Sequence, residues 1–328
     1  MTQLPTYRSC LGPDIQAHVE RKQALGRQFV REAGILADLD RFLDAHDEHD
    51  LTQTGFAAWA LTLGRLAPAS RRQYLRIARS LCLYRRRSDP TCFVPDPTGF
   101  PDAGPQRPAL IFSEQQILDL LSTADSLPAM TCSPLQPAVY RQTITLAYTS
   151  GLRCGELVRL TLGDCDLDQR TLLVRGSKGD KSRLVALSNS ATAATDRYLA
   201  ARCRFRHGPN APLLAHGRDG SSPYSVRGID LGFRRLFRDT GIVGVAGRPA
   251  RLHDVRHTHA VHALLGWYRQ GIDPQAKLPV LAASMGHVSL ASTAYYLNLI
   301  EPVVQQAGER FADYARTIVA PPQEHSHA

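Results

Sequence analysis

Four separated segments of the chain carry side chains that together could break a phosphodiester bond. They are GLRCGELVRL with Arg153 and Glu156, the turn GSKGDK with Lys178, LHDVRHTHAVHAL with His253 and Arg256, and MGHVSLASTAYYLNL with His287 and Tyr296. Guanidinium, ammonium and imidazole groups donate hydrogen bonds to anionic oxygens, and a tyrosine hydroxyl can act as a nucleophile. The residue types therefore indicate phosphoryl transfer to a tyrosine.

Phosphoryl transfer to a tyrosine requires groups that stabilise negative charge and a group that promotes loss of the tyrosine proton. A phosphodiester attacked by a phenol passes through a five-coordinate phosphorus with extra negative charge, which guanidinium groups stabilise. By analogy with other phosphoryl transfer, one arginine is worth roughly 10³–10⁵ in rate, about 4–7 kcal/mol. A free tyrosine has a pKa of about 10, so only about 0.1% is phenolate at pH 7. The site must supply a base or a cationic field.

Each segment by itself has an ordinary interpretation. An arginine after Gly151 can be a surface residue, and Lys178 in a polar turn can simply be solvated. His253 and Arg256 can cap a helix, His287 can lie at a helix end, and a lone tyrosine is more often a core residue. The order and spacing of the four segments carry the prediction.

The elements that must position these residues are mainly helices. An apolar helix over 137–150 ends at Gly151. Ser113 with Gln116 forms a capping-box pattern that marks the start of a helix following Ser113. Strands over 171–175 and 183–187 flank the turn that carries Lys178. Further helices are predicted over 189–205, 223–239, 254–268, 278–285 and 302–318.

The N-terminal part also reads as helical, over 14–45, 51–63 and 70–87. The last of these contains seven arginines and no acid. Clustered guanidinium groups repel one another unless an anion neutralises them, and DNA phosphate fits this requirement. We therefore expect DNA contacts from Arg71, Arg72, Arg76 and Arg79. A solvated basic face is the alternative.

Composition agrees with an anionic partner. The 328 residues carry a net charge of +9 and the pI is about 9.4. Nucleic acid is the first candidate and an anionic membrane surface the second, although a basic enzyme without a polyanion partner has the same composition. Seven scattered cysteines show no zinc-finger or redox spacing. With no signal peptide or membrane span in the sequence, these thiols predict a cytoplasmic protein.

Prolines mark the expected domain boundary. Six of them crowd residues 89–109, where neither helix nor sheet can continue. We predict a helical domain over 1–88, an exposed and rather stiff linker over 89–109, a second domain over 110–318 and a disordered tail over 319–328.

The order of the four segments resembles the tyrosine recombinase family, also called phage integrases. An arginine follows a Gly-Leu pair there, with a glutamate three residues on, as Arg153 and Glu156 do. A lysine lies in a hairpin turn that ends in Arg-Leu-Val. Lys178 matches it, with Lys181 as the second choice. The remaining matches are His-x-x-Arg-His at His253, Arg256 and His257, Gly-His at Gly286 and His287, and a tyrosine nine residues later, at Tyr296 instead of the neighbouring Tyr295.

The resemblance implies a fold and a mechanism. A SAM-like helical core-binding domain would precede a catalytic domain that is mainly helical with a small sheet. Tyr296 would form a 3′-phosphotyrosyl link, and neither ATP, metal nor another cofactor is needed. Arg153 and Arg256 would hold the phosphate, Lys178 would protonate the leaving oxygen, His253 would assist proton transfer, His287 would hydrogen-bond the phosphate, and Glu156 would orient an active-site group.

The partners implied are double-stranded DNA in the nucleoid and three further protomers. These form a homo-tetramer, or a hetero-tetramer with sister recombinases, in which the segment after Tyr296 docks on a neighbour. The stretch WYRQGIDPQAKLPVLAASMGHVSL resembles members carried by transposons. Integration, excision, transposition and dimer resolution all remain open, as does the DNA site.

Three rival interpretations remain. A non-catalytic relative could keep the fold and act as an accessory or regulatory DNA-binding subunit. A type IB topoisomerase would share the chemistry without a defined site. A metal site could use histidines of the segment 253–262, where His253 and His257 are four residues apart, although no cysteine or carboxylate completes a ligand set.

Overall fold

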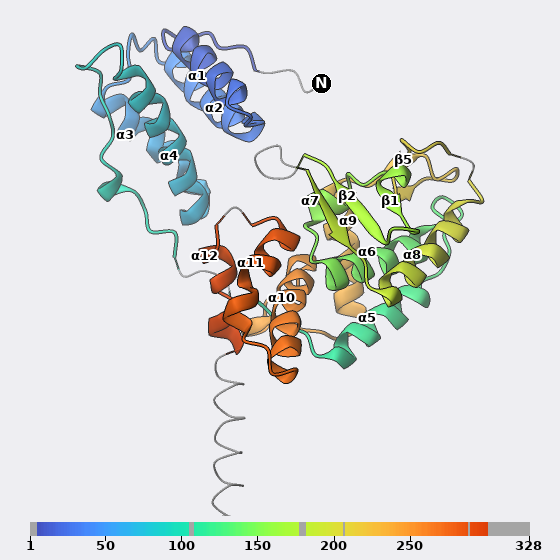
Figure 1. Ribbon diagram of the computed structural model, residues 1–328. Helices are drawn as coiled ribbons and strands as arrows, with labels where there is room; N and C mark the ends of the chain where they lie inside the picture. The colour runs from blue at the N-terminus through green and yellow to red at the C-terminus, as the bar shows by residue number, and fades with distance from the viewer. Residues whose placement is uncertain (1–4, 105–107, 177–181, 206, 288, 301–328) are drawn as a thin grey trace, which may run out of the picture. The chain divides into compact units, whose positions relative to one another are not determined.

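The computed structural model describes residues 5–104, 108–176, 182–205, 207–287 and 289–300 (Figure 1). The chain divides into two units, Met1–Arg107 and Pro108–Ala328, and the division falls within the proline-rich stretch 89–109. Both units are built mainly from helices, and the second contains a small sheet. This confirms the predicted fold class.

Within its described residues, the N-terminal unit has one more α-helix than the sequence predicted. Its helices are α1 (Gly12–Ala24), α2 (Val30–Ala45), α3 (Gln53–Thr62) and α4 (Pro68–Arg85). A single helix over 14–45 was therefore wrong, because Gly26 (φ 74°) and Phe29 (φ 50°) adopt left-handed conformations between α1 and α2. Both helices bury one face in the same core, so helical spacing continues across the break.

The core of this unit extends into the proline-rich stretch. Trp59 is fully buried, and Cys92 and Phe100 are 7% and 8% exposed. The ring of Phe56 contacts the rings of Phe93 and Phe100, with centroids 5.9 and 6.2 Å apart. The prolines prevent a helix here, but burying the aromatic rings still stabilises the unit. Residues 92–100 thus pack on the N-terminal unit, whereas the sequence predicted an exposed linker.

The second unit is organised around a buried helix. Its helices are α5 (Glu114–Asp125), α6 (Gln136–Ser150), α7 (Cys154–Leu157), α8 (Asn189–Arg202), α9 (Val226–Asp239), α10 (Leu252–Arg269), α11 (Pro274–Met285) and α12 (Ala291–Ala294). Helix α6 packs against α5, α8 and α10, which accounts for its apolar sequence. The capping box of α5 is confirmed, since Ser113 and Gln116 exchange hydrogen bonds of 2.9 and 3.1 Å.

The predicted hairpin is confirmed at its strands and extended by a third strand. The antiparallel order is β1 (Cys165–Asp166), β2 (Thr171–Val174) and β3 (Arg183–Ala186), with Val174 opposite Arg183. Residues 177–181 of the turn lie outside the described residues. A separate pair is formed by β4 (Ala215–His216) and β5 (Ser222–Pro223).

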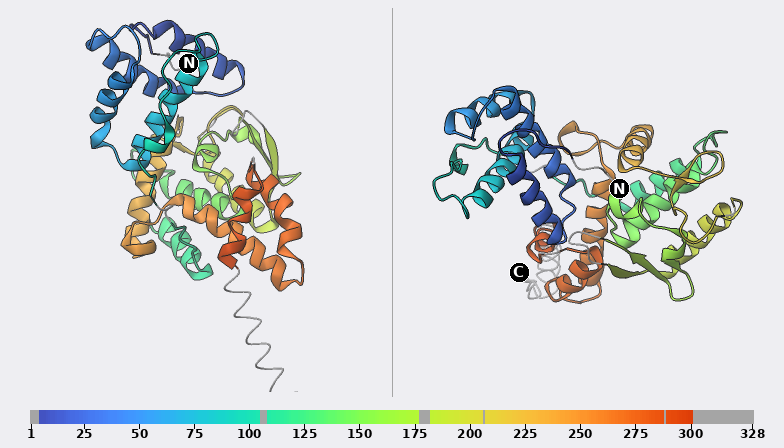
Figure 2. Two further views of the ribbon diagram at one scale, coloured as in Figure 1. Left: turned by 90° about the vertical axis from the view of Figure 1, so that its left-hand side faces the viewer. Right: turned by 90° about the horizontal axis from the view of Figure 1, so that it is seen from above.

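Helices α10, α11 and α12 enclose a smaller apolar core that includes Leu264, Leu281, Met285 and Tyr296. Helix α11 begins earlier than predicted, at Pro274, where the side chain of Asp273 caps it. It also lies beside β3, as both views in Figure 2 show. The sheet, α6, α10 and α11 therefore lie next to one another, and they carry or flank the segments with Arg153, Arg256 and His287.

The predicted helix 302–318 and the tail 319–328 lie outside the described residues. In the part of the chain that the structure describes, no helix has both the length and the apolar character needed to cross a membrane.

Candidate active site

Arg153 begins the site at the end of α6. Gly151 ends that helix in a left-handed conformation (φ 61°), and a Cβ on it would lie 2.6 Å from Cδ2 of His259. Glycine is thus required at this turn for two reasons, backbone conformation and space. The one-turn helix α7 then brings Arg153 and Glu156 together. The backbone N–H and Nη1 of Arg153 each donate to the Glu156 carboxylate over 2.9 Å.

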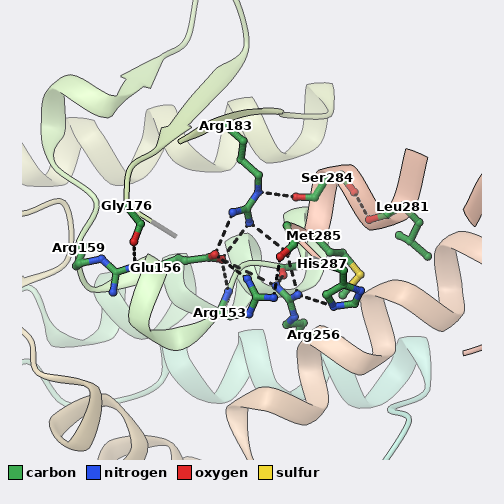
Figure 3. A network of polar contacts seen from close by, with 12 residues as sticks. Arg153, Glu156, Arg159, Gly176, Arg183, Arg256, Leu281, Ser284, Met285 and His287 are labelled. Carbon is green, nitrogen blue, oxygen red and sulfur yellow. Dashed lines mark hydrogen bonds and ion pairs between the residues drawn. The ribbon is translucent and has the colours of Figure 1, made fainter. Parts of the chain in front are cut away.

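Glu156 is a buried carboxylate among three guanidinium groups, as Figure 3 shows. Burial by itself would raise its pKa. Hydrogen bonds from Arg183 and from the backbone of Arg153, with the charges of both arginines, outweigh burial and lower the pKa to about 2. The side chain is therefore ionised at neutral pH and acts as the local counterion.

Arg256 is 1% exposed and lies in the first turns of α10. Its Nη1 donates to the carbonyl of Gly151, and its Nη2 donates over 2.9 Å to the carbonyl of Met285 and to Nε2 of His287. Burial, followed by the charge of Arg153, lowers its pKa to about 10. The guanidinium still carries its charge at pH 7 and joins the ends of α6 and α11.

His287 follows Gly286, which ends α11 with φ 65°. Burial, followed by the charges of Arg256 and Arg153, lowers the histidine pKa to about 4, so the ring is neutral at pH 7. Since an arginine can only donate, Nε2 accepts from Arg256 and the proton lies on Nδ1, 2.7 Å from Oγ1 of Thr293. The sequence predicts that His287 donates a hydrogen bond to the phosphate. For this the ring must give up its contact with Arg256 or with Thr293.

Tyr296 lies directly beside these groups. Its hydroxyl is 2.9 Å from Nδ1 of His257, and its ring stacks on that of His287 with centroids 6.2 Å apart. Only 2% of Tyr296 is exposed, whereas 36% of the neighbouring Tyr295 is. Burial raises the pKa of Tyr296, and the nearby Arg256 opposes that shift. The phenol is therefore protonated at neutral pH.

Of the two remaining predicted residues, the structure describes His253 but not Lys178. His253 is exposed and packs edge-on against the ring of His257, with centroids 4.5 Å apart. Lys178 and the alternative Lys181 belong to the segment 177–181, which lies outside the described residues. The structure thus brings together Arg153, Glu156, Arg256, His287 and Tyr296, with His253 one ring away.

The other histidines of α10 contact protein groups. Nδ1 of His259 lies 2.7 Å from the carbonyl of Tyr148, and Nδ1 of His262 lies 2.9 Å from the Tyr148 hydroxyl. Among the residues that the structure describes, no three His, Cys, Asp or Glu side chains are grouped so as to hold a metal ion.

Two residues of the site, Arg183 and Thr293, were not singled out from the sequence, and His257 was matched to a motif without being given a role in catalysis. Arg183 binds Glu156, His257 contacts the tyrosine hydroxyl, and Thr293 holds His287. The first belongs to the Arg-Leu-Val that ends the hairpin motif, and the second to His-x-x-Arg-His. Their positions in these motifs could have indicated that both residues belong to the site. For Thr293 the sequence offered none.

The N-terminal arginines do not share one environment. Arg72 donates to the carbonyl of Pro101 over 3.1 Å, and Arg79 donates to that of Pro95 over 2.9 Å. These two side chains fasten the proline-rich stretch to α4, while Arg76 is exposed.

Comparison with known proteins gives a consistent result. The model of the Phage integrase family matches residues 111–301. A relative from Sinorhizobium fredii, named integrase/recombinase y4rB, is 33% identical over 300 residues, covering 90% of this chain and 95% of its own. Tyrosine recombinase XerD of Caulobacter vibrioides is 29% identical over 296 residues, covering 86% of this chain and 87% of its own.

A solved structure shares the fold. The XerH site-specific recombinase, bound to palindromic difH substrate in a post-cleavage complex, aligns with a TM-score of 0.63. The alignment covers 91% of this chain and 84% of the other, at 16% sequence identity.

Proposed function

The chain belongs to the phage integrase family, and on this premise we propose that it is a site-specific DNA recombinase that works through a 3′-phosphotyrosyl intermediate. Integration, excision or transposition would be the outcome of the recombination. One observation carries the proposal: side chains from three distant segments lie together beside the Glu156 carboxylate. They are Arg153, Arg256, His287 and Tyr296.

The reaction exchanges one phosphodiester for another. Oη of Tyr296 attacks the phosphorus, the bond to the 5′-oxygen breaks, and that oxygen leaves as a hydroxyl after taking a proton. The energy of the broken bond is kept in the phosphotyrosyl link. A 5′-hydroxyl can therefore reverse the step and rejoin the strand without ATP.

Arg153 and Arg256 supply the positive field for this step. Arg256 is rigidly placed by carbonyls and His287, and the side chain of Arg153, 30% exposed, is accessible to a phosphate. Charged donors fixed before the reaction stabilise the developing negative charge without reorganising, and removing one such donor typically costs about 10²–10³ in rate.

The tyrosine proton has a nearby acceptor. Burial, with the charge of His253 as the next cause, lowers the pKa of His257 to about 4, so its imidazole is neutral at pH 7. It lies within hydrogen-bond distance of the Tyr296 hydroxyl, as a base must. His253, exposed beside His257, would pass the proton to solvent, and Lys178 would protonate the leaving 5′-oxygen.

The remaining expectations concern assembly on DNA. We propose that double-stranded nucleoid DNA in the cytoplasm is the substrate and that four protomers, identical or from sister recombinases, act on two sites. Arg71, Arg72, Arg76 and Arg79 would contact the phosphate backbone. The support is the net charge of +9 together with the arginine content of α4.

The test is covalent capture of DNA. A pool of nicked duplexes with randomised sequence is incubated with the protein, so that the short 5′-end diffuses away after cleavage. Wild-type protein should form an adduct that survives SDS, and sequencing the captured DNA identifies the site. Tyr296→Phe should bind the same DNA without an adduct, and the matched control Tyr295→Phe should keep the adduct.

An adduct formed by Tyr296→Phe would place the nucleophile elsewhere. DNA binding with no adduct from the wild type would identify a non-catalytic accessory subunit. Adducts on unrelated sequences, without strand exchange between two sites, would identify a topoisomerase.

A further inference from the structure

Arg183, the first residue of β3, directs its guanidinium into the centre of the site (Figure 3). Nη1 and Nη2 donate to the two carboxylate oxygens of Glu156, each over 3.0 Å. Nε donates over 2.9 Å to the carbonyl of Ser284, and Nη2 also reaches the carbonyl of Met285 at 3.3 Å. The side chain is 13% exposed, so these contacts are largely shielded from water.

The three guanidinium groups around Glu156 are not equivalent. Arg183 faces the carboxylate with a parallel pair of hydrogen bonds, the strongest geometry available to the two groups. The side chain of Arg153 bonds one oxygen through Nη1 and turns Nη2 to the carbonyl of Gly286. Arg256 is 3.9 Å from Glu156, and its hydrogen bonds go to two carbonyls and a histidine.

The positive charges around Glu156 outnumber its single negative charge. Three guanidinium groups surround a single ionised carboxylate, which leaves two positive charges for an incoming phosphate. A buried carboxylate without a partner is costly, so it attracts whichever cation is nearest. If Arg183 were absent, Arg153 and Arg256 would be the nearest cations.

Gly286 provides the space for Arg183. A Cβ on this residue would lie 2.6 Å from Nη1 and 2.8 Å from Cζ of Arg183. The guanidinium therefore packs against the turn that carries His287, and it bonds two of the last carbonyls of α11.

We propose that Arg183 is a positioning residue that binds the Glu156 carboxylate and so keeps Arg153 and Arg256 available for the scissile phosphate. This inference rests on the proposed recombinase function. Arg183 acts through the other two arginines and has no contact with the reacting atoms.

The test compares two substrates that differ in charge at the scissile position. One is a phosphodiester, and the other a methylphosphonate, in which a methyl group replaces one non-bridging oxygen and removes the negative charge. Both are placed in a nicked duplex carrying the site found by covalent capture. The single-turnover rate of adduct formation is measured at saturating protein.

We expect Arg183→Gln to slow adduct formation on the phosphodiester by roughly ten- to hundredfold, less than the 10²–10³ typical of a lost direct donor. On the methylphosphonate the deficit relative to wild type should shrink to a fewfold, because less charge needs stabilising. The double variant Glu156→Gln/Arg183→Gln should recover most of the phosphodiester rate, since no carboxylate then competes for Arg153 and Arg256.

The matched control is Arg175→Gln. Arg175 pairs with another buried carboxylate, that of Asp164, over 2.6 Å in the same unit, and this variant should keep the wild-type rate on both substrates. An equal deficit of Arg183→Gln on both substrates, or a double variant no faster than the single one, would overturn the inference.

Arg183→Lys provides a second route if Arg183→Gln does not fold. An ammonium keeps the charge but lacks the planar fork, so we expect an intermediate deficit that again shrinks on the methylphosphonate. A deficit unchanged by substrate would refute the proposal. By contrast, failure of wild-type protein to form any Tyr296-dependent adduct would refute the recombinase function itself.

Discussion

At the scale of single residues, the proposed reaction requires an acceptor for the proton of Tyr296, and His257 is the side chain beside its hydroxyl. The two atoms lie 2.9 Å apart. Burial raises the pKa of the phenol, with the charge of Arg256 opposing, and lowers that of the imidazole to about 4. At neutral pH the pair therefore consists of a phenol and a neutral imidazole, the protonation states that general-base catalysis requires.

We expect His257→Asn to slow adduct formation by roughly 10²–10⁴-fold, because an amide can keep the hydrogen bond but cannot take the proton. The wild-type rate should rise with pH as His257 loses its proton near pH 4 and level off by about pH 6, about two units above that pKa. The rate is measured in single turnover between pH 3.5 and 8.

His262→Asn is the matched control, since Nδ1 of His262 also lies 2.9 Å from a tyrosine hydroxyl, that of Tyr148, on the same helix. It should leave the rate unchanged. A His257→Asn variant as fast as wild type would show that His257 takes no proton from the nucleophile.

At the scale of elements, the site is made where helices end. The last carbonyls of α11 and the carbonyl of Gly151 after α6 accept hydrogen bonds from arginines, which satisfies groups that a helix end leaves free. The glycines at these ends turn the chain sharply enough for Arg153 and His287 to follow within two residues. The ends of α6 and α11 thus determine where the cations lie.

Gly286→Ala should therefore damage both stability and activity. A left-handed alanine costs about 1–2 kcal/mol, and its Cβ would clash with the Arg183 guanidinium. We expect a loss of at least that size in the free energy of unfolding, measured by urea denaturation, and a slower adduct formation.

The control is Gly266→Ala in α10, where a Cβ meets nothing within 4 Å. Alanine there should be neutral or stabilise by about 0.5–1 kcal/mol. Equal stability of the two variants would contradict the role given to the turn at Gly286.

At the scale of the whole molecule, the net charge of +9 would attract the phosphates of the proposed DNA substrate. Release of counterions from neutralised phosphates makes such binding depend steeply on salt. Arginines already bonded to the protein's own carbonyls, as Arg72 and Arg79 are, have fewer donors left for phosphate than the exposed Arg76.

We expect Arg76→Ala to weaken DNA binding and to reduce the slope of log K against log[salt] by about 0.9, the value for one phosphate contact. Fluorescence anisotropy over a salt series measures both quantities. Arg41→Ala, which removes another exposed arginine of the same unit, is the control and should leave the slope unchanged. An unaltered slope in Arg76→Ala would remove Arg76 from the DNA interface.

Much of this protein followed from its sequence, because local spacing decides which side chains share one turn. Arg153 with Glu156, the start of α10 with Arg256, and the strands of the hairpin were all predicted from patterns within a few residues. The break between α1 and α2 was missed, since two helices facing one core keep the same apolar spacing across it.

Only the tertiary structure decided which distant groups became partners. The pairs Arg183–Glu156 and His257–Tyr296 are 27 and 39 residues apart in the chain. Their contacts depend on how α10, α11 and the sheet pack around α6, and no local pattern encodes that packing. For the same reason the arginine count of α4 was readable from the sequence, whereas the binding of Arg72 and Arg79 to the proline-rich stretch was not.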